Sequence, residues 1–228
     1  MHCSYAGLTG IRLSHDDSPS PAVTASLIAL RDRLNSKFPK GLTDCVLGYR
    51  TLTVFFDPAE LSRETLLGAI SDLDSKLGVA SNNSQYSSRT IELPVWYAEE
   101  SGQDLSTVAE RSGLSVAAVI ELHSSTAYNA YATGFAPGFC YLGEVSEQLE
   151  MPRLGTPRRA VPPGSVAIAD RQTAVYPSRS PGGWHLLGRC PLQLFDLEQT
   201  PPGLISVGDQ VLFKPISRDE FLSMGGRL

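Results

Sequence analysis

Residues 134–189, which open with GFAPGFCYLG (134–143) and close with SPGGWHLLGR (180–189), decide the fold of this chain. These 56 residues contain eight glycines and seven prolines, whereas the whole 228-residue chain contains 36 residues of these two types. The segment also carries five large aromatic rings, on Phe135, Phe139, Tyr141, Tyr176 and Trp184. A disordered segment would lack such rings, so we expect short strands joined by tight turns, in a β-barrel or a β-sandwich with elaborated loops.

The sequence on both sides of this segment supplies further short elements. Upstream, residues 90–97 read as a strand, followed by two short helices over 104–112 and 115–125. Runs of β-formers predict strands at 165–169, 173–176, 184–188, 192–195 and 210–214. A capping box over 217–220 predicts a terminal helix. Residues 90–228 are therefore predicted to form one β-rich domain.

The first 80 residues show the periodicity of a separate α/β unit. Apolar residues spaced by three and four predict a helix from Val23 to Phe38 and a second one from Leu66 to Leu77. Strands before and between these helices give the order β-α-β-β-α, which is typical of a ferredoxin-like split βαβ layer. Ser and Asn supply six of the twelve residues from Gly78 to Arg89, so we assign residues 81–89 to a linker. The predicted fold class is α+β, with domains at 1–80 and 90–228.

Charge and composition exclude several classes of function. The net charge of −5 argues against general binding to nucleic acid or anionic membranes. Residues 98–126 have the spacing of a DNA-binding helix pair, but their net charge of −4 cannot hold a phosphate backbone, so we interpret the pair as structural. No apolar run reaches the roughly 18–20 residues that span a bilayer, and no secretory signal is visible, so we expect a cytoplasmic protein. The four scattered cysteines are expected to be free thiols, with no zinc spacing and no predicted metal site.

Arginines gather in the β-rich segment and indicate an anion site. Residues 151–189 hold six arginines, no lysine and one acid, Asp170, which is a net charge of +5 inside an acidic chain. Arginine suits bidentate recognition of carboxylate or phosphate. Solvated, unrelated arginines on a loop surface are the alternative. The candidate anion contacts are Arg153 and Arg158, with Tyr176 to orient a polar ligand group.

The loops around these arginines combine glycines, whose backbone no side chain covers, with prolines in rigid turns and with aromatic residues. Glycine lets a ligand approach main-chain N–H groups and proline holds a loop still, so Gly182 and Gly183 are candidate backbone donors. Five residues are candidates for the pocket wall or for a partner interface: Phe135, Pro137, Gly138, Phe139 and Trp184. His123 ends the second short helix; a structural histidine is the simpler interpretation, and a substrate-binding role is kept beside it. No catalytic residue is identified.

Three runs of the sequence resemble one known family. They are residues 134–196, which include GFxPGFxYLG and SPGGWxLxGR patterns, LPVWYAEESGQDLSTVAERSGLSVAAVIELHSSTAYNAYATGF (93–135) and GYRTLTVFFDP (48–58). Together they resemble the family of 5-oxoprolinase B subunits, also called KipI-type kinase inhibitor or allophanate hydrolase subunit 1, a carboxyltransferase domain. The resemblance implies a ferredoxin-like domain followed by a cyclophilin-like β-barrel.

The resemblance also implies a function. It predicts one part of a multi-subunit enzyme that cleaves the lactam of 5-oxo-L-proline, a small anionic substrate, to L-glutamate, using ATP. The implied partners are the C subunit of 5-oxoprolinase and a third protein, the A subunit, and the chain alone is expected to be inactive. A different class, a non-catalytic inhibitor of a sensor histidine kinase, stays open, as does a carboxyltransferase half of a urea carboxylase or allophanate hydrolase system.

Overall fold

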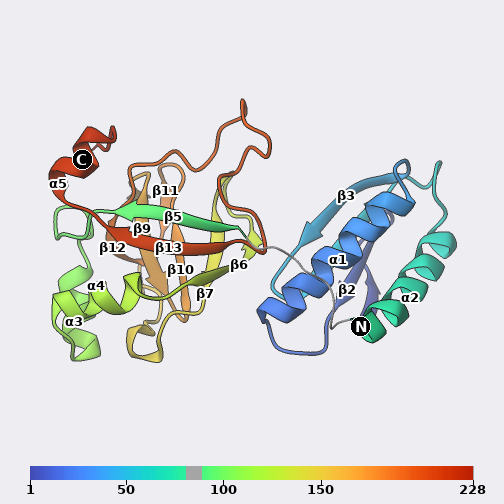
Figure 1. Ribbon diagram of the computed structural model, residues 1–228, viewed down its shortest axis with the longest axis horizontal. Helices are drawn as coiled ribbons and strands as arrows, with labels where there is room; N and C mark the ends of the chain where they lie inside the picture. The colour runs from blue at the N-terminus through green and yellow to red at the C-terminus, as the bar shows by residue number, and fades with distance from the viewer. Residues whose placement is uncertain (81–88, 228) are drawn as a thin grey trace. The chain divides into compact units, whose positions relative to one another are not determined.

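The computed structural model describes residues 1–80 and 89–227, which fall into two compact units, Met1–Ser88 and Arg89–Leu228. Apart from Arg89, the linker predicted at 81–89 lies outside the described residues. Figure 1 labels the elements of both units. In the described residues, no helix is long and apolar enough to cross a membrane.

The first unit is a four-stranded sheet with two helices. Its elements are β1 (His2–Tyr5), β2 (Gly10–Ser14), α1 (Pro21–Lys37), β3 (Leu42–Leu47), β4 (Thr51–Phe56) and α2 (Arg63–Ala80). The sheet order is β1-β2-β4-β3, with antiparallel neighbours. Because β4 is inserted between β2 and β3, which α1 connects, the predicted split βαβ arrangement is confirmed. Strand β1, which the sequence patterns do not predict, adds an outer hairpin strand beside β2.

Helix α1 shows how the sequence fixes this unit. The Ser20 side chain accepts a hydrogen bond from the Val23 N–H, and Pro21 occupies the first turn, where its missing N–H costs nothing. Leu27, Leu30 and Leu34 are fully buried on one face. This face packs α1 against α2 and the sheet, as the predicted spacing requires (Figure 1).

The second unit is built on a seven-stranded sheet. Its strands are β5 (Thr90–Val95), β6 (Tyr128–Thr133), β7 (Cys140–Gly143), β9 (Ser165–Ala169), β10 (Gln172–Val175), β12 (His185–Arg189) and β13 (Gln210–Pro215). Their order is β12-β9-β10-β7-β6-β13-β5. Trp96 directly follows the edge strand β5, and Arg189 ends the other edge strand, β12. The N–H of Trp96 donates to the Arg189 carbonyl at 2.9 Å, and the N–H of Arg189 donates to the Trp96 carbonyl at 3.0 Å. This pair joins the edges into a nearly closed barrel, so the predicted barrel is confirmed.

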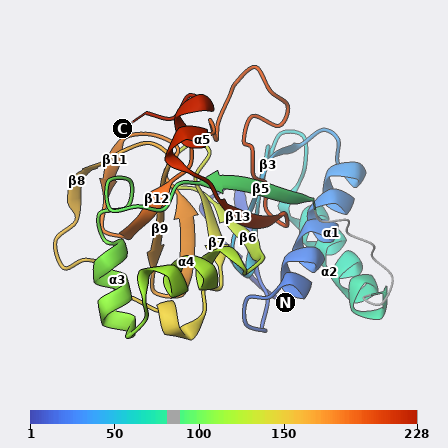
Figure 2. The same ribbon diagram turned by 60° about the vertical axis from the view of Figure 1, so that its left-hand side comes forward.

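Short helices and a small second sheet complete this unit. The helices are α3 (Leu105–Ser112), α4 (Val116–Ser124), the 3-10 turn η1 (Glu147–Leu149) and α5 (Arg218–Ser223). Ser115 caps α4, and Ser217 with Glu220 forms the predicted capping box of α5. Strands β8 (Arg158–Val161) and β11 (Ser180–Gly182) pair with each other beside β9 and β12 (Figure 2).

Strand β9 is buried on both faces, and this places the functional region. Its larger residues Val166 and Ile168 belong to the main core, whereas Ala167 and Ala169 belong to a second apolar cluster. Successive side chains of a strand point to opposite faces, so the second cluster lies across the sheet from the main core. The aromatic rings of the glycine- and proline-rich loops pack in that second cluster.

One predicted strand is wrong. Residues 192–195 form no strand, and Phe195 makes only an isolated bridge to Gly203. The chain here runs in a loop from Cys190 to Gln210, in which the Leu204 N–H donates to the Leu194 carbonyl. The apolar residues of this stretch have the composition of a strand, but they serve instead to anchor the loop to the main core.

The contact between Gly102 and β12 gives a test of this packing. A Cβ on Gly102 would collide with the backbone of Leu187 and Gly188, which cannot yield as a flexible side chain would. We expect Gly102→Ala to lower the free energy of unfolding in urea by about 3 kcal/mol or more. Gly155→Ala, where a Cβ meets nothing within 4 Å, should stay within about 0.5 kcal/mol of the parent. Equal stability of the two variants would contradict the packing described.

Candidate functional site

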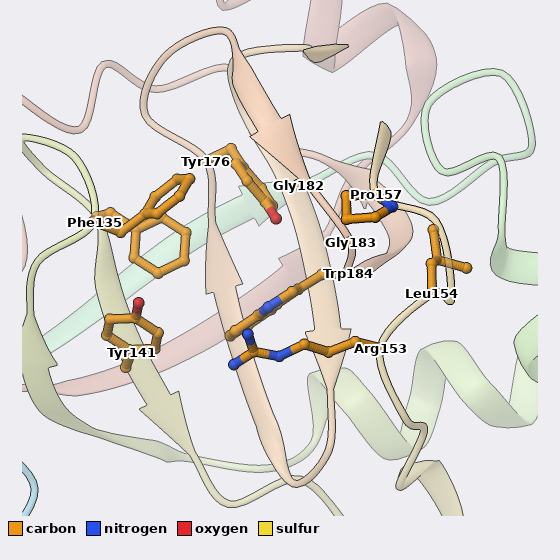
Figure 3. Close-up of a pocket in the computed structure, with 10 residues that line it drawn as sticks. Phe135, Tyr141, Arg153, Leu154, Pro157, Tyr176, Gly182, Gly183 and Trp184 are labelled. Carbon is orange, nitrogen blue, oxygen red and sulfur yellow. The ribbon is translucent and has the colours of Figure 1, made fainter. Parts of the chain in front are cut away.

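A cavity of about 170 Å³ opens where the glycine- and proline-rich loops meet the second apolar cluster (Figure 3). It is lined by Phe135, Phe139, Tyr141, Arg153, Leu154, Pro157, Tyr176, Gly182, Gly183 and Trp184. Seven of these ten residues are sequence candidates for substrate binding or the pocket wall. Tyr141, Leu154 and Pro157 are additions that the structure makes to the site.

The walls of the cavity are a connected group of aromatic rings centred on Phe139. The Phe139 ring meets four others edge-on, with centroid separations between 4.9 and 5.9 Å: Phe135, Tyr141, Tyr176 and Trp184. Edge-to-face pairs of this kind are favourable beyond the area they bury. The rings rest near Ala167, Ala169 and Ala174, whose small side chains leave room for them on this face of the sheet.

Tyr176 is held tightly at one side of the cavity. A Cβ on Gly182 would collide with the hydroxyl end of Tyr176, so this ring packs directly against the bare backbone of Gly182. Burial raises the pKa of the Tyr176 phenol, although a hydrogen bond from the Trp184 backbone and the nearby charge of Arg153 lower it. The phenol therefore stays protonated near neutral pH and offers a neutral O–H to the cavity.

Arg153 supplies the positive charge of the cavity. Its side chain extends from the loop before Leu154 into the group of residues in Figure 3. Its Nε lies 3.8 Å from Asp170 Oδ2, and both side chains are more than 60% exposed. Exposed pairs at such a separation are weak, so the guanidinium can exchange Asp170 for a ligand anion.

Arg158, the second predicted anion contact, does not line the cavity. Its Nη2 forms an ion pair with Asp104 Oδ1 at 2.6 Å, and its Nη1 donates to the Trp184 carbonyl at 3.1 Å. The other Asp104 oxygen accepts from the Leu186 N–H at 2.7 Å. Arg158 thus holds Trp184, the residue just before β12, and its guanidinium is committed to protein partners.

The remaining arginines of the segment do not gather at the cavity either. Arg171 pairs with Glu144 and Glu147, and Arg189 donates to the Arg227 carbonyl at the barrel seam. Arg159 and Arg179 are exposed and do not line the cavity. The six arginines of this segment therefore do not gather at one anion site, because most of them hold the fold or face solvent.

His123 lies in the main core and not at the cavity. It is fully buried, stacked on Phe213 at 4.6 Å between ring centroids. Its Nε2 lies 2.9 Å from Thr173 Oγ1, whose proton goes to the Ala167 carbonyl, so Nε2 donates and Nδ1 accepts from the Tyr97 hydroxyl at 2.7 Å. Burial lowers the pKa of His123 to about 3, so the ring is neutral. The structural interpretation of His123 agrees with this placement.

The turn before Phe139 shapes the mouth of the cavity. Gly138 has a φ of +84°, and a Cβ there would press on Leu194 and Phe195, so Gly138 serves close packing. Phe135 has a φ of +72°, unusual for a bulky residue, and the residue is 58% exposed. Pro137 and Gly138 do not line the cavity. Such strain tends to occur at ligand or partner contacts.

Neither buried thiol of this unit is a nucleophile. Burial raises the pKa of Cys140 to about 12 and that of Cys190 to about 11. The thiolate is the reactive form, so both groups are inert near neutral pH.

Comparisons with known proteins identify the family and the fold of the chain. Residues 1–205 match the family described as carboxyltransferase domain, subdomain C and D. The chain is 39% identical to the B subunit of 5-oxoprolinase from Bacillus subtilis over 81% of this chain and 79% of that protein. The crystal structure of TTHA0988 is 38% identical with a TM-score of 0.78, and the match covers 92% of this chain but 40% of that one. The urea amidolyase of Kluyveromyces lactis, 16% identical with a TM-score of 0.73 over 97% of this chain and 15% of that chain, shares the fold.

The buried imidazole of His123 gives a pH dependence to stability. Its pKa of about 3 in the folded protein lies below the usual 6.5, so the unfolded chain binds the proton more readily. The free energy of unfolding should be unaffected by this group above pH 6.5 and should fall by roughly 1 kcal/mol per pH unit below it. His123→Gln should flatten the slope between pH 6 and 4.5 in urea titrations. An unchanged slope in His123→Gln would refute the assignment.

The Asp104–Arg158 pair gives a second test. Arg158→Ala leaves the Asp104 carboxylate buried without its cation, so we expect a loss of about 3–5 kcal/mol in the free energy of unfolding. Arg159→Ala, at the exposed neighbouring position, should change it by less than about 0.5 kcal/mol. The double variant Asp104→Ala, Arg158→Ala should lose less than the sum of the two single variants. Additive losses would show that the pair is not coupled.

Proposed function

Since the chain belongs to the carboxyltransferase domain family that includes the 5-oxoprolinase B subunits, we propose that it is the B subunit of a multi-subunit, ATP-dependent 5-oxoprolinase. The assembled enzyme would cleave the lactam C–N bond of 5-oxo-L-proline with water, giving L-glutamate, with ATP hydrolysis as the driving force. In this proposal the aromatic cavity of the second unit forms part of the substrate site.

The observation that carries the proposal is the pairing of flat aromatic walls with a single guanidinium in one small cavity. 5-Oxoproline is a flat five-membered ring with one carboxylate. The rings of Phe139 and Trp184 offer faces and edges to such a ring, and Arg153 offers a fork to the carboxylate. The volume of about 170 Å³ is below the roughly 300–1,000 Å³ of sites for drug-sized ligands, as a small substrate requires.

The same residues suit the developing charge of the reaction. Phosphorylating the amide oxygen of the lactam, or adding water to its carbonyl carbon, places negative charge on oxygen. The neutral Tyr176 hydroxyl can orient the polar edge of the lactam. Gly183 lines the cavity and has no side chain, so its backbone N–H is the candidate donor there. Fixed donors at such a position stabilise charge that appears in the transition state.

ATP and the remaining catalytic groups belong, in this proposal, to other proteins of the complex. The cavity, at about 170 Å³, is too small for a nucleoside triphosphate. In the described part of the chain, Arg153 is the only cationic residue that lines it. More than half of the TTHA0988 chain lies outside its match to this chain, so in that protein the same fold is covalently joined to a longer segment. This supports a partner that completes the site, for which the C and A subunits of 5-oxoprolinase are the candidates.

The proposal is tested by reconstitution. The chain is purified with candidate C and A subunits from the same genome, and glutamate release from 5-oxoproline is measured with and without ATP. We expect ATP-dependent release by the complex and none by the chain alone. Loss of a charge-assisted hydrogen bond of about 1.5–3 kcal/mol predicts that Arg153→Ala lowers kcat/KM by roughly 10- to 150-fold.

Two controls sharpen this experiment. Arg159→Ala removes an exposed arginine of the same unit outside the cavity and should leave kcat/KM unchanged. Arg153→Lys keeps the positive charge but cannot form the two parallel hydrogen bonds of a guanidinium to a carboxylate. Its kcat/KM should therefore fall between those of the parent and Arg153→Ala. Unchanged kinetics in Arg153→Ala would remove the carboxylate role, and no release by the parent complex would refute the enzyme assignment. Inhibition of a sensor kinase or carboxylation of urea would then be measured in its place.

A further inference from the structure

The loop that carries Arg153 is fastened to the barrel on both sides of that residue. Before it, the imidazole Nε2 of His185 lies 3.0 Å from the Pro152 carbonyl oxygen. After it, the Leu154 N–H donates to the Gly183 carbonyl at 2.7 Å. Gly183 and His185, which make these contacts, are the neighbours of Trp184 in the sequence, and the Trp184 ring lines the cavity (Figure 3). The backbone on either side of Arg153 is therefore hydrogen-bonded to the residues on either side of Trp184, by the His185 side chain and by the Gly183 carbonyl.

His185 supplies the one side-chain anchor of this arrangement among the described contacts. It is 1% exposed, and it is not among the residues that line the cavity. Because a carbonyl oxygen can only accept, Nε2 carries the proton. The other ring nitrogen, Nδ1, is buried and has no hydrogen-bond partner among the described residues. The hydrogen bond to Pro152 is thus the specific contact that this imidazole makes.

The position of Arg153 depends on its backbone more than on its own contacts. Its side chain is 62% exposed, and its ion pair with Asp170 is long, at 3.8 Å. A long exposed side chain loses rotamer freedom when it binds a ligand, and a loose backbone adds to that cost. A fixed loop therefore allows Arg153 to bind an anion more tightly. The residues that fix the loop need not contact the anion themselves.

We propose that His185 is a positioning residue, which holds loop 152–154 against the barrel so that the Arg153 guanidinium enters the cavity ready to bind a carboxylate. The inference rests on the proposed function for the identity of the carboxylate, but its structural half concerns the loop alone. The two halves are therefore tested separately.

The structural half is tested on the full chain alone, by hydrogen exchange of the Leu154 amide. The matched variants are His185→Gln, whose side-chain N–H can reach the place of Nε2, and His185→Asn, whose shorter amide cannot. We expect exchange at Leu154 about tenfold faster in His185→Asn than in the parent, and near the parent rate in His185→Gln. The amides of Val166 and Ile168 in the main core serve as the reference for general destabilisation. Equal rates at Leu154 in the parent and both variants, or a rise shared by the core amides, would overturn the proposal.

The functional half is tested in the reconstituted complex with 5-oxoproline. We expect His185→Asn to raise KM about tenfold with little change in kcat, and His185→Gln to restore it. In an Arg153→Ala background, His185→Asn should add no further loss, because its effect passes through Arg153. A full additional loss in that background would overturn the positioning role. Changed exchange at Leu154 with an inactive parent complex would support the loop anchor and refute the proposed function instead.

Discussion

The ion pair between Asp104 and Arg158 is the constraint from which the cavity is built. Asp104 stands just before α3 and contacts Leu186 twice, through its backbone N–H at 3.1 Å and its carboxylate at 2.7 Å. Arg158 begins β8 and adds a bond to the Trp184 carbonyl. The start of α3, the small second sheet and the barrel are thereby joined where β12 begins, next to Trp184. Because both charges are mostly buried, the arrangement tolerates little displacement.

The cavity also depends on the unequal faces of β9. The strand reads Ser165-Val166-Ala167-Ile168-Ala169, and its large residues fill the main core while its alanines face the rings. Larger residues at the alanine positions would displace the aromatic cluster around Phe139. The barrel thus serves as a rigid support, and the binding surface is assembled on it by loops that bring glycine, proline and aromatic residues together.

Most of the architecture and the aromatic half of the site could be predicted from the sequence. Glycine, proline and rings in one segment mark loops near a surface, and in the structure Phe135, Phe139, Tyr176 and Trp184 do line one cavity. The arginines were less predictable, because what a charge does depends on its partner in space. Asp104 is 54 residues from Arg158 in the sequence, and no local sequence pattern predicts that the two side chains form an ion pair. The sequence patterns also do not predict β6, β7, β8 and β11. Of these, β8 and β11 have four residues or fewer, and each exists through its pairing with the other.

The parallel pairing of β5 with β13 has a consequence for the order of events during synthesis. Thr90 pairs with Gln210 and Val95 with Pro215, so the first strand of the barrel can pair with its last strand only after that strand has been synthesised. While the ribosome is still making the intervening residues, the hydrogen-bonding groups of β5 that face β13 have no partner. The first unit, complete in sequence long before, can fold in the meantime, since domains generally form as units from the N-terminus. A nascent chain stalled before residue 210 would therefore expose an unmatched strand, the kind of surface that chaperones shield from aggregation.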